Sequence, residues 1–226
     1  MYRMNELIEQ TRRQVTEIGR LLFDRFLTDA AGGNVSARAG DVICVSPRFS
    51  GSKYQWRIRP DQVLVTDLNG NKLEGEGELS REVRVHLRLY KEFLEGMAVV
   101  HSHPRNVMVF ATAGKPIPPV WEGTLKFGVI QVCQFAPAHT PDLAEEVAAV
   151  MRGQETALRK QAIAVIAPAH GLFTLGKSLA AAYDATERID GQAYSILMSK
   201  FLPNGPVDIA AISQNLINAA AGWEKA

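Results

Sequence analysis

Hydrophobic residues recur at three- and four-residue steps near the start of the chain and again after residue 80. Over residues 5–27 this spacing predicts an amphipathic helix that ends at Gly32-Gly33. A second helix is predicted over residues 80–93, with Ser80 as its N-cap because a serine hydroxyl accepts hydrogen bonds from the free N–H groups of a first turn. Each helix therefore has one apolar face for the core.

Short β-prone runs are interleaved with these and further helices. Strands are predicted at residues 35–38, 41–46, 63–66, 97–100, 129–135, 162–166 and 172–175. Further helices are predicted around residues 106–113, 141–151, 154–159, 178–201 and 208–221. This interleaving within one core predicts an α/β layered fold. Turn signals such as Asn69-Gly70 indicate hairpins, so the sheet is not expected to be purely parallel.

Composition and charge exclude several classes of protein. The 226 residues are 46% hydrophobic and 22% charged, which is ordinary for a globular protein, and they are expected to form a single domain over residues 1–226. Lys and Arg number 25 against 24 Asp and Glu, so there is no electrostatic footprint for nucleic acid or an anionic membrane. No apolar run approaches the ~18 residues that span a bilayer. We expect a cytoplasmic protein with no nucleic-acid or membrane partner.

The two cysteines do not suggest chemistry. Cys44 and Cys133 are far apart in the sequence, and each lies within an apolar, strand-like run. Free cysteine behaves as a small buried hydrophobe in a reducing compartment. Both are therefore predicted to be buried and unpaired.

A His-Ser-His sequence follows the predicted strand at residues 97–100. Side chains alternate between the two faces of an extended chain, so His101 and His103 project from the same side. Neutral imidazole is a good ligand for Zn²⁺ and similar ions, and such a pair forms half of a site. Surface and core histidines also occur at this spacing, so the pair alone leaves both interpretations open.

His170 is a third candidate ligand. It follows the buried strand at residues 162–166 and precedes Gly171, which places it on a tight turn at a sheet end, where site residues gather. Three histidines leave coordination positions open, the arrangement of catalytic rather than structural metal sites. His86 and His139 have no partner at ligand spacing, and we assign them to a helix face and a loop.

Acidic and glycine-containing segments supply further candidates. Glu82 is in the first turn of the second helix, where a carboxylate is either a base or labile metal ligand, or simply a partner of the helix dipole. Backbone N–H groups of residues 32–36 and the hydroxyls, amides and Lys53 of residues 50–53 suit a phosphate. Glycine-serine segments are also common as plain turns.

Taken in order, four motifs resemble those of the class II aldolase/adducin family: Gly33-Asn34-Val35-Ser36, Ser80-Arg81-Glu82 with His86, His101-Ser102-His103, and His170-Gly171. The resemblance extends over about residues 5–201. It implies a three-layer α/β/α sandwich around a mostly antiparallel sheet, usually as a fourfold-symmetric homotetramer with active sites between subunits. It also implies a divalent metal, typically Zn²⁺, although imidazole ligands equally suit Co²⁺, Mn²⁺ and Fe²⁺.

The resemblance also implies roles for individual residues. His101, His103 and His170 match metal ligands, and Glu82 matches the carboxylate that ligates the empty metal and acts as base once substrate displaces it. The family's phosphate-binding positions match Gly33, Asn34, Ser50, Gly51 and Ser80. The implied partner is a small phosphorylated sugar, and the implied reaction is retro-aldol cleavage of a ketose 1-phosphate to dihydroxyacetone phosphate and an aldehyde.

Two positions depart from the pattern of fuculose-phosphate-aldolase-like members. Glu122 stands in the segment where those members have a catalytic tyrosine. Methylthioribulose 1-phosphate dehydratases use a glutamate there as general acid/base, so water elimination is an alternative, as is a solvated loop carboxylate without a role. Arg81 replaces a serine and is suited to grip a phosphate or carboxylate, which admits sugar-acid-phosphate decarboxylation.

A non-catalytic, adducin-like interaction module is the remaining alternative. The presence of all three histidines and of Glu82 favours an enzyme over such a module.

Overall fold

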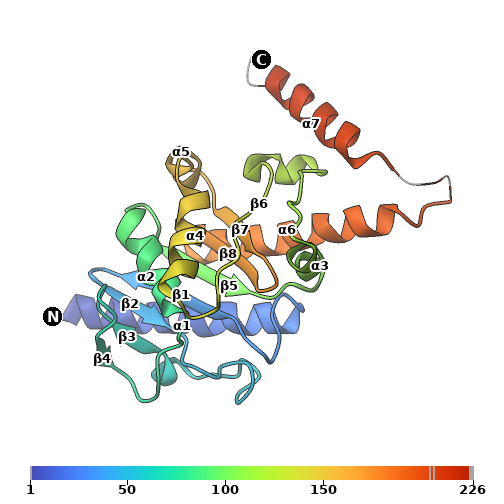
Figure 1. Cartoon of the computed structure of the whole chain (residues 1–226). Helices are drawn as coiled ribbons and strands as arrows, with labels where there is room; N and C mark the ends of the chain where they lie inside the picture. The colour runs from blue at the N-terminus through green and yellow to red at the C-terminus, as the bar shows by residue number, and fades with distance from the viewer. Residues whose placement is uncertain (1, 204, 206, 224–226) are drawn as a thin grey trace.

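The computed structural model describes residues 2–203, 205 and 207–223. Its centre is an eight-stranded sheet with the strand order β4-β3-β2-β1-β5-β8-β7-β6, and helices pack on both faces (Figure 1). All neighbouring strands are antiparallel except β6, which runs parallel to β7. The strands are β1 (Asn34–Ala39), β2 (Val42–Val45), β3 (Leu64–Thr66), β4 (Lys72–Glu74), β5 (Ala98–Ser102), β6 (Gln131–Val132), β7 (Ile163–Ala167) and β8 (Gly171–Gly176).

Helices form the two outer layers. One face of the sheet is covered by α2 and α4, and the other by α1, α3 and α6. The helices are α1 (Tyr2–Asp24), α2 (Val83–Glu92), α3 (Arg105–Ala113), α4 (Pro141–Met151), α5 (Glu155–Leu158), α6 (Leu179–Ser199) and α7 (Ile209–Trp223), with 3-10 helices η1 (Pro60–Gln62) and η2 (Glu122–Phe127). This arrangement confirms the predicted three-layer α/β/α sandwich with a mostly antiparallel sheet.

The alternation of side chains along each strand accounts for the layers. In β7, Ile163, Val165 and Ala167 pack beneath α2 and α4. The intervening residues Ala164 and Ile166 pack against α3 and α6. Because both faces of the sheet are covered, such a strand is apolar at every position and has the continuous hydrophobic run noted in the sequence.

Strand β1 is apolar on one face only. Val35 and Ala37 pack toward α1. On the opposite face, the Ser36 hydroxyl lies 2.6 Å from Nδ1 of His86 and 2.8 Å from the hydroxyl of Tyr90, both on α2. The polar contacts between β1 and α2 therefore begin within the core and continue to the strand end, where Asn34 lies.

The structure corrects three local predictions. Helix α1 ends at Asp24 rather than residue 27, because the chain turns at Phe26, which has a φ of 59°. Helix α2 begins at Val83 with Glu82 in the N-cap position, so Ser80 is not the N-cap. The Ser80 hydroxyl accepts hydrogen bonds from Nδ2 of Asn34 at 3.1 Å and from the N–H of Glu82 at 3.4 Å.

The strand predicted at residues 129–135 is reduced to β6. Ile130, the residue before β6, pairs with Ile117, whereas Gln131 and Val132 pair with β7. One apolar run is thus divided between two different partners, which its hydrophobicity did not reveal.

Both cysteines are free and buried, as predicted. Burial raises the pKa of Cys44 to about 12 and that of Cys133 to about 11, so neither is a reactive thiolate. None of the helices in the described part of the chain has the length and apolarity to cross a lipid bilayer.

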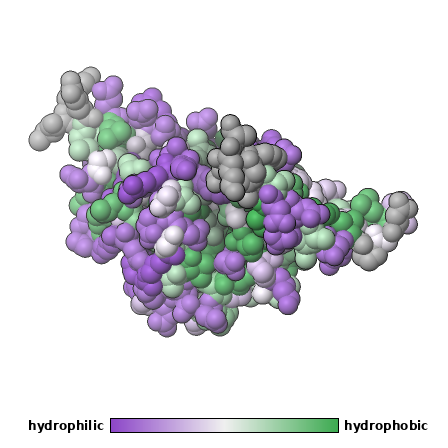
Figure 2. Space-filling model, turned by 90° about the horizontal axis from the view of Figure 1, so that it is seen from above, coloured by the Kyte–Doolittle hydropathy of each residue, from purple (hydrophilic) through white to green (hydrophobic). Residues whose placement is uncertain are grey.

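Exposed apolar side chains gather near the end of α6. Tyr194 and Met198 lie on this helix, and Phe201 and Leu202 follow it, all of them exposed. In the view of Figure 2, hydrophobic side chains are most frequent toward the end where α6 and α7 meet, and hydrophilic ones dominate the N-terminal side. Helix α7 itself stands away from the sheet (Figure 1).

Candidate metal and active site

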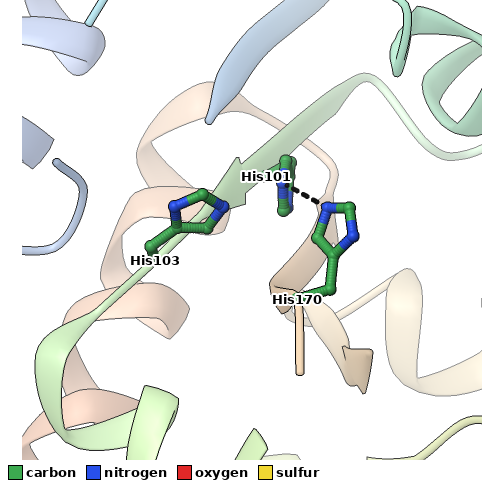
Figure 3. A group of neighbouring side chains, drawn as sticks. All are labelled: His101, His103 and His170. Carbon is green, nitrogen blue, oxygen red and sulfur yellow. Dashed lines mark hydrogen bonds between the residues drawn. The ribbon is translucent and has the colours of Figure 1, made fainter. Parts of the chain in front are cut away.

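The three predicted histidines meet at the ends of internal strands of the central sheet (Figure 3). His101 is on β5, His103 follows the same strand, and His170 lies in the turn between β7 and β8. Because β5 and β8 are paired, the ring of His101 stacks on Phe173, with centroids 4.1 Å apart. One ligand nitrogen from each of the three histidines lies within 4.8 Å of the others, and Nε2 of His101 is 3.1 Å from Nε2 of His170.

Two of these imidazoles are oriented by acceptors on their far side. Nδ1 of His101 lies 3.1 Å from the carbonyl oxygen of Leu172, and Nδ1 of His103 lies 3.2 Å from Oδ1 of Asp29. A carbonyl or carboxylate oxygen only accepts, so each Nδ1 carries a hydrogen and the Nε2 atom of each ring faces the site. Burial, with the nearby His101, lowers the pKa of His103 to about 4, so its imidazole is neutral at pH 7.

Glu82 completes this cluster. Its Oε1 lies 3.0 Å from Nε2 of His170, its Oε2 lies 3.2 Å from Nε2 of His101, and Asn34 donates a hydrogen bond to Oε2 at 3.0 Å. Burial alone would raise the pKa of the Glu82 carboxyl, but the facing imidazoles of His101 and His170 outweigh it and hold the pKa below its usual range. The carboxylate is therefore ionised at neutral pH.

The donor set fits a divalent cation. Nε2 of His101 lies 3.2 Å from a carboxylate oxygen of Glu82 and 3.1 Å from Nε2 of His170, so three possible ligand atoms converge where a cation would bind all of them. In a tetrahedral zinc site, Zn–N bonds of about 2.0–2.1 Å separate ligand nitrogens by about 3.3 Å, close to the 3.1 Å between the two Nε2 atoms. Three imidazoles and one carboxylate also suit Co²⁺, Mn²⁺ and Fe²⁺.

Two glycines let the chain pack tightly around the His103 ring. A Cβ atom on Gly32 would lie 2.5 Å from Cε1 of His103. One on Gly171 would lie 2.6 Å from the carbonyl oxygen of Ser102 and 2.8 Å from Cδ2 of His103. These distances are shorter than the contacts that real Cβ atoms make in folded proteins. A side chain at either position would therefore displace the His103 ring or the neighbouring backbone.

The cluster opens into a cavity of about 350 Å³. The cavity is lined by the residues that match the family's phosphate-binding positions and by the arginine beside them: Gly33, Asn34, Ser50, Gly51, Ser80 and Arg81. Glu82, His103 and His170 also line it, so the structure brings the phosphate candidates and the metal candidates together. The Ser50 hydroxyl donates to the carbonyl oxygen of Pro47 at 2.7 Å and is thus engaged within its own loop.

Glu122 lies elsewhere in the chain. It is exposed at the start of η2 and is not among the residues that line this cavity. Its catalytic role stays a prediction. Lys53 and Arg59, basic residues of the long loop, line a neighbouring cavity, where Arg59 pairs with Asp61.

Three residues of the site gave no signal in the sequence. Asp29 orients His103, as described above. Arg48 lines the cavity near Arg81 and lies over the ring of Phe49, 4.5 Å from its centroid. His139 also lines the cavity, with its Nδ1 3.6 Å from Oε1 of Glu82. Asp29, Arg48 and His139 lie on loops that are far apart in the sequence. Spacing along the chain therefore could not identify them as neighbours.

His86 lies on the buried face of α2, beneath the site rather than in it. It is completely buried, and its Nδ1 shares a hydrogen bond with the Ser36 hydroxyl. Burial lowers its pKa to about 3. The imidazole is therefore neutral and links β1 to α2.

Comparison with known proteins agrees with this geometry. Residues 13–196 match the model of the family described as "Class II Aldolase and Adducin N-terminal domain". An L-fuculose phosphate aldolase of Methanococcus maripaludis is 30% identical over 175 residues, which cover 77% of this chain and 89% of that protein. A 3-oxo-tetronate 4-phosphate decarboxylase of Haemophilus influenzae is 28% identical over 188 residues, which cover 79% of this chain and 83% of that protein.

A solved structure of L-fuculose 1-phosphate aldolase has the same fold. It superimposes with a TM-score of 0.75, covers 94% of this chain and 96% of its own, and is 22% identical in sequence. At this level of identity the likeness concerns the fold alone.

Proposed function

We propose that this chain, which belongs to the class II aldolase and adducin N-terminal domain family, is a divalent-metal-dependent lyase that cleaves a ketose 1-phosphate by retro-aldol chemistry. The products would be dihydroxyacetone phosphate and an aldehyde. The observation that carries this proposal is that the imidazoles of His101, His103 and His170 meet beside Glu82, at a cavity lined by Glu82, His103, His170, glycine-containing loops and two arginines. Named relatives with sugar-phosphate substrates support the same class of reaction.

His101, His103 and His170 would hold the metal, for which Zn²⁺ is our first candidate. When bound there, the metal supplies a Lewis acid that polarises the ketose carbonyl. Leu172 and Asp29 keep the hydrogens of two imidazoles on Nδ1 and so keep both Nε2 atoms available as ligands.

Glu82 is the proton-transfer group in this proposal. Its carboxylate is ionised at neutral pH, and Asn34 fixes one of its oxygens by a hydrogen bond. It accepts the proton of the C4 hydroxyl as the C3–C4 bond breaks and the electron pair remains with C3. It then returns a proton to C3, which completes dihydroxyacetone phosphate.

The phosphate group would bind at the other end of the cavity. Gly33, Gly51, Arg48 and Arg81 line the cavity, and Arg48 is also paired with Glu78. Backbone amides in glycine-containing loops and paired arginines are typical ligands of phosphate. Fixing the phosphate there would place the carbon chain toward Glu82 and the histidines.

Decarboxylation of a sugar-acid phosphate is the second candidate. Arg81 and Arg48 give the cavity two cations, enough for a carboxylate as well as a phosphate, and one named relative is a decarboxylase of such a substrate. Water elimination has less support, because Glu122 lies outside the cavity of the described chain.

We also propose that the protein acts as a homotetramer with active sites between subunits. The family resemblance suggests this assembly. The exposed apolar residues Tyr194, Met198, Phe201 and Leu202 support self-association, since surfaces of this kind tend to be buried in contacts between proteins.

Product analysis tests the reaction. Metal-loaded protein is incubated with fuculose, rhamnulose, ribulose and methylthioribulose 1-phosphates, with chelator-treated protein as the control. We expect dihydroxyacetone phosphate from at least one of them, and none after chelation. Loss of water without carbon–carbon cleavage would instead establish the dehydratase. If no substrate of the panel reacts, the aldolase proposal is wrong and release of CO₂ from sugar-acid phosphates becomes the test.

A further inference from the structure

His139 has a backbone conformation that its turn requires but that a histidine side chain disfavours. It lies in the loop between β6 and α4, with a φ of 70°. The N–H of Thr140 donates to the carbonyl oxygen of Pro137 at 3.4 Å, so His139 is the third residue of a tight turn. A positive φ at that position is characteristic of type II turns, in which glycine or asparagine is favoured.

The fold does not require a histidine at this position. Thr140 ends the turn by accepting a hydrogen bond from the N–H of Leu143 as the N-cap of α4, and this contact does not involve the His139 side chain. A strained non-glycine residue whose side chain has no structural contact to justify it points to a functional constraint. We therefore expect the function of His139 to lie on the side of the loop to which its ring points.

The ring of His139 faces the cavity. Its side chain is 36% exposed, yet Nδ1 is buried, lies 3.6 Å from Oε1 of Glu82, and has no hydrogen-bond partner among the described residues. At 3.6 Å the two atoms are too far apart for a hydrogen bond. In contrast to Nδ1 of His101 and His103, this nitrogen has no hydrogen-bond partner in the described part of the chain, and a small rotation of the partly exposed ring would bring it to a ligand beside the carboxylate.

We propose that His139 is a substrate-binding residue that hydrogen-bonds an oxygen of the carbon chain of the phosphorylated ketose, next to the oxygen on which Glu82 acts. This inference rests on the proposed function. A group so near the Glu82 carboxylate reaches the hydroxyl and carbonyl oxygens of the chain, whereas the arginines and glycine loops hold the phosphate. His139 thus contributes to the selection of a polyhydroxylated substrate, because a site built around such a hydrogen bond discriminates against ligands that lack the oxygen.

Binding of two probes to the metal-loaded protein tests this inference. Dihydroxyacetone phosphate presents both a phosphate and carbon-chain oxygens, whereas inorganic phosphate presents only the anion. In His139→Gly we expect the affinity for dihydroxyacetone phosphate, measured by calorimetry, to fall between about 3-fold and 10-fold, the value of one hydrogen bond. The affinity for inorganic phosphate should change less than twofold, and the melting temperature should stay equal or rise, since glycine suits the turn.

Two further variants serve as controls. His139→Asn tolerates a positive φ and retains a hydrogen-bonding amide, so it should recover part of the lost affinity. Gln55→Gly removes another exposed side chain with a positive φ, 47°, outside the cavity lining, and should leave both affinities unchanged.

The alternative outcomes are distinct. If wild-type protein does not bind dihydroxyacetone phosphate, the proposed function fails and this inference fails with it. If wild type binds it and His139→Gly binds it equally well, only the inference fails. Equal loss of both probes would make His139 a phosphate ligand, and a lowered melting temperature with loss of metal would make it a structural residue. Both results would overturn the proposal.

Discussion

Substitution of Asp29 separates its contribution to the metal site from its contribution to the loop. Oδ1 of Asp29 lies 3.2 Å from Nδ1 of His103 and accepts hydrogen bonds from the N–H groups of Ala31 and Gly32 at 2.9 and 3.1 Å. Asparagine would keep an oxygen for these three partners but lose the charge. Alanine would remove all the contacts. Metal affinity should therefore decrease from wild type to Asp29→Asn to Asp29→Ala.

The size of each effect follows from the contacts. Loss of an outer partner of a ligand histidine typically weakens metal binding by about 10-fold to 100-fold, and the 52% exposure of the Asp29 side chain favours the lower end for alanine. For asparagine, exchange of a charge-assisted hydrogen bond for a neutral one costs about 1 kcal/mol, or about fivefold. At saturating metal a tenfold loss lowers the stabilisation by metal by about 1.4 kcal/mol. With an unfolding entropy of about 2.1 cal/mol/K for each of 226 residues, the metal-dependent gain in melting temperature shrinks by about 3 °C.

Competition with a chromophoric chelator measures the affinity for Zn²⁺, and thermal unfolding with and without metal measures the coupling. In metal-free protein, Asp29→Asn should melt at the wild-type temperature, because the loop keeps its acceptor, whereas Asp29→Ala should melt lower. Affinities within twofold of wild type in both variants would refute the orienting role of Asp29. The orienting role would also be refuted if Asp29→Asn lost as much stability in the metal-free protein as in the metal-loaded protein.

Three further substitutions test other parts of the site. Glu82→Gln should retain metal, measured by elemental analysis, while turnover falls by about 10²-fold to 10⁴-fold, and unchanged turnover would contradict its role as base. Arg81→Met should weaken binding of phosphorylated but not of neutral sugars, and an equal loss for both would contradict a role in anion binding. Burial keeps the pKa of His86 near 3 in the folded protein. Below pH 6.5 only the unfolded chain therefore takes up this proton, and the free energy of unfolding decreases as the pH is lowered. From pH 7 to 5 the loss is about 2 kcal/mol, and urea denaturation of metal-free His86→Asn should lack it, whereas an unchanged pH dependence would be contrary to the buried neutral imidazole.

Periodicity predicted the long elements well. Helices α1 and α6 and the central strands β5 and β7 lie within a few residues of their predicted bounds. These elements bury the faces that their own hydrophobic patterns define. Strand β6 was overestimated because its pairing depends on Ile117 and on β7, which are remote in sequence. The N-cap assigned to Ser80 was wrong because α2 begins only at Val83; the Ser80 hydroxyl accepts from the N–H of Glu82 and also from Asn34, 46 residues away, a contact that spacing could not reveal.

The site was predictable where residue types carry their own chemistry. Three histidines at sheet ends suggested a metal, and they lie together in the structure. Asp29, Arg48 and His139 were missed because an aspartate before Ala-Ala-Gly-Gly or a histidine in a loop has many ordinary explanations. What gives these residues a function is the approach of three loops to the end of the sheet, which arises only when the sheet has formed.

The separation of the histidines along the chain also affects the order of events in folding. His101 and His170 are 69 residues apart and meet only after β5 has paired with β8 in the middle of the sheet. A contact of such long range forms late, because chain closure must precede it. A metal ion at this place would then bind after the rate-limiting step of folding, so its stabilisation would appear mainly as slower unfolding, with little change in the folding rate. Kinetic persistence of the folded protein, rather than speed of folding, would be what the metal confers.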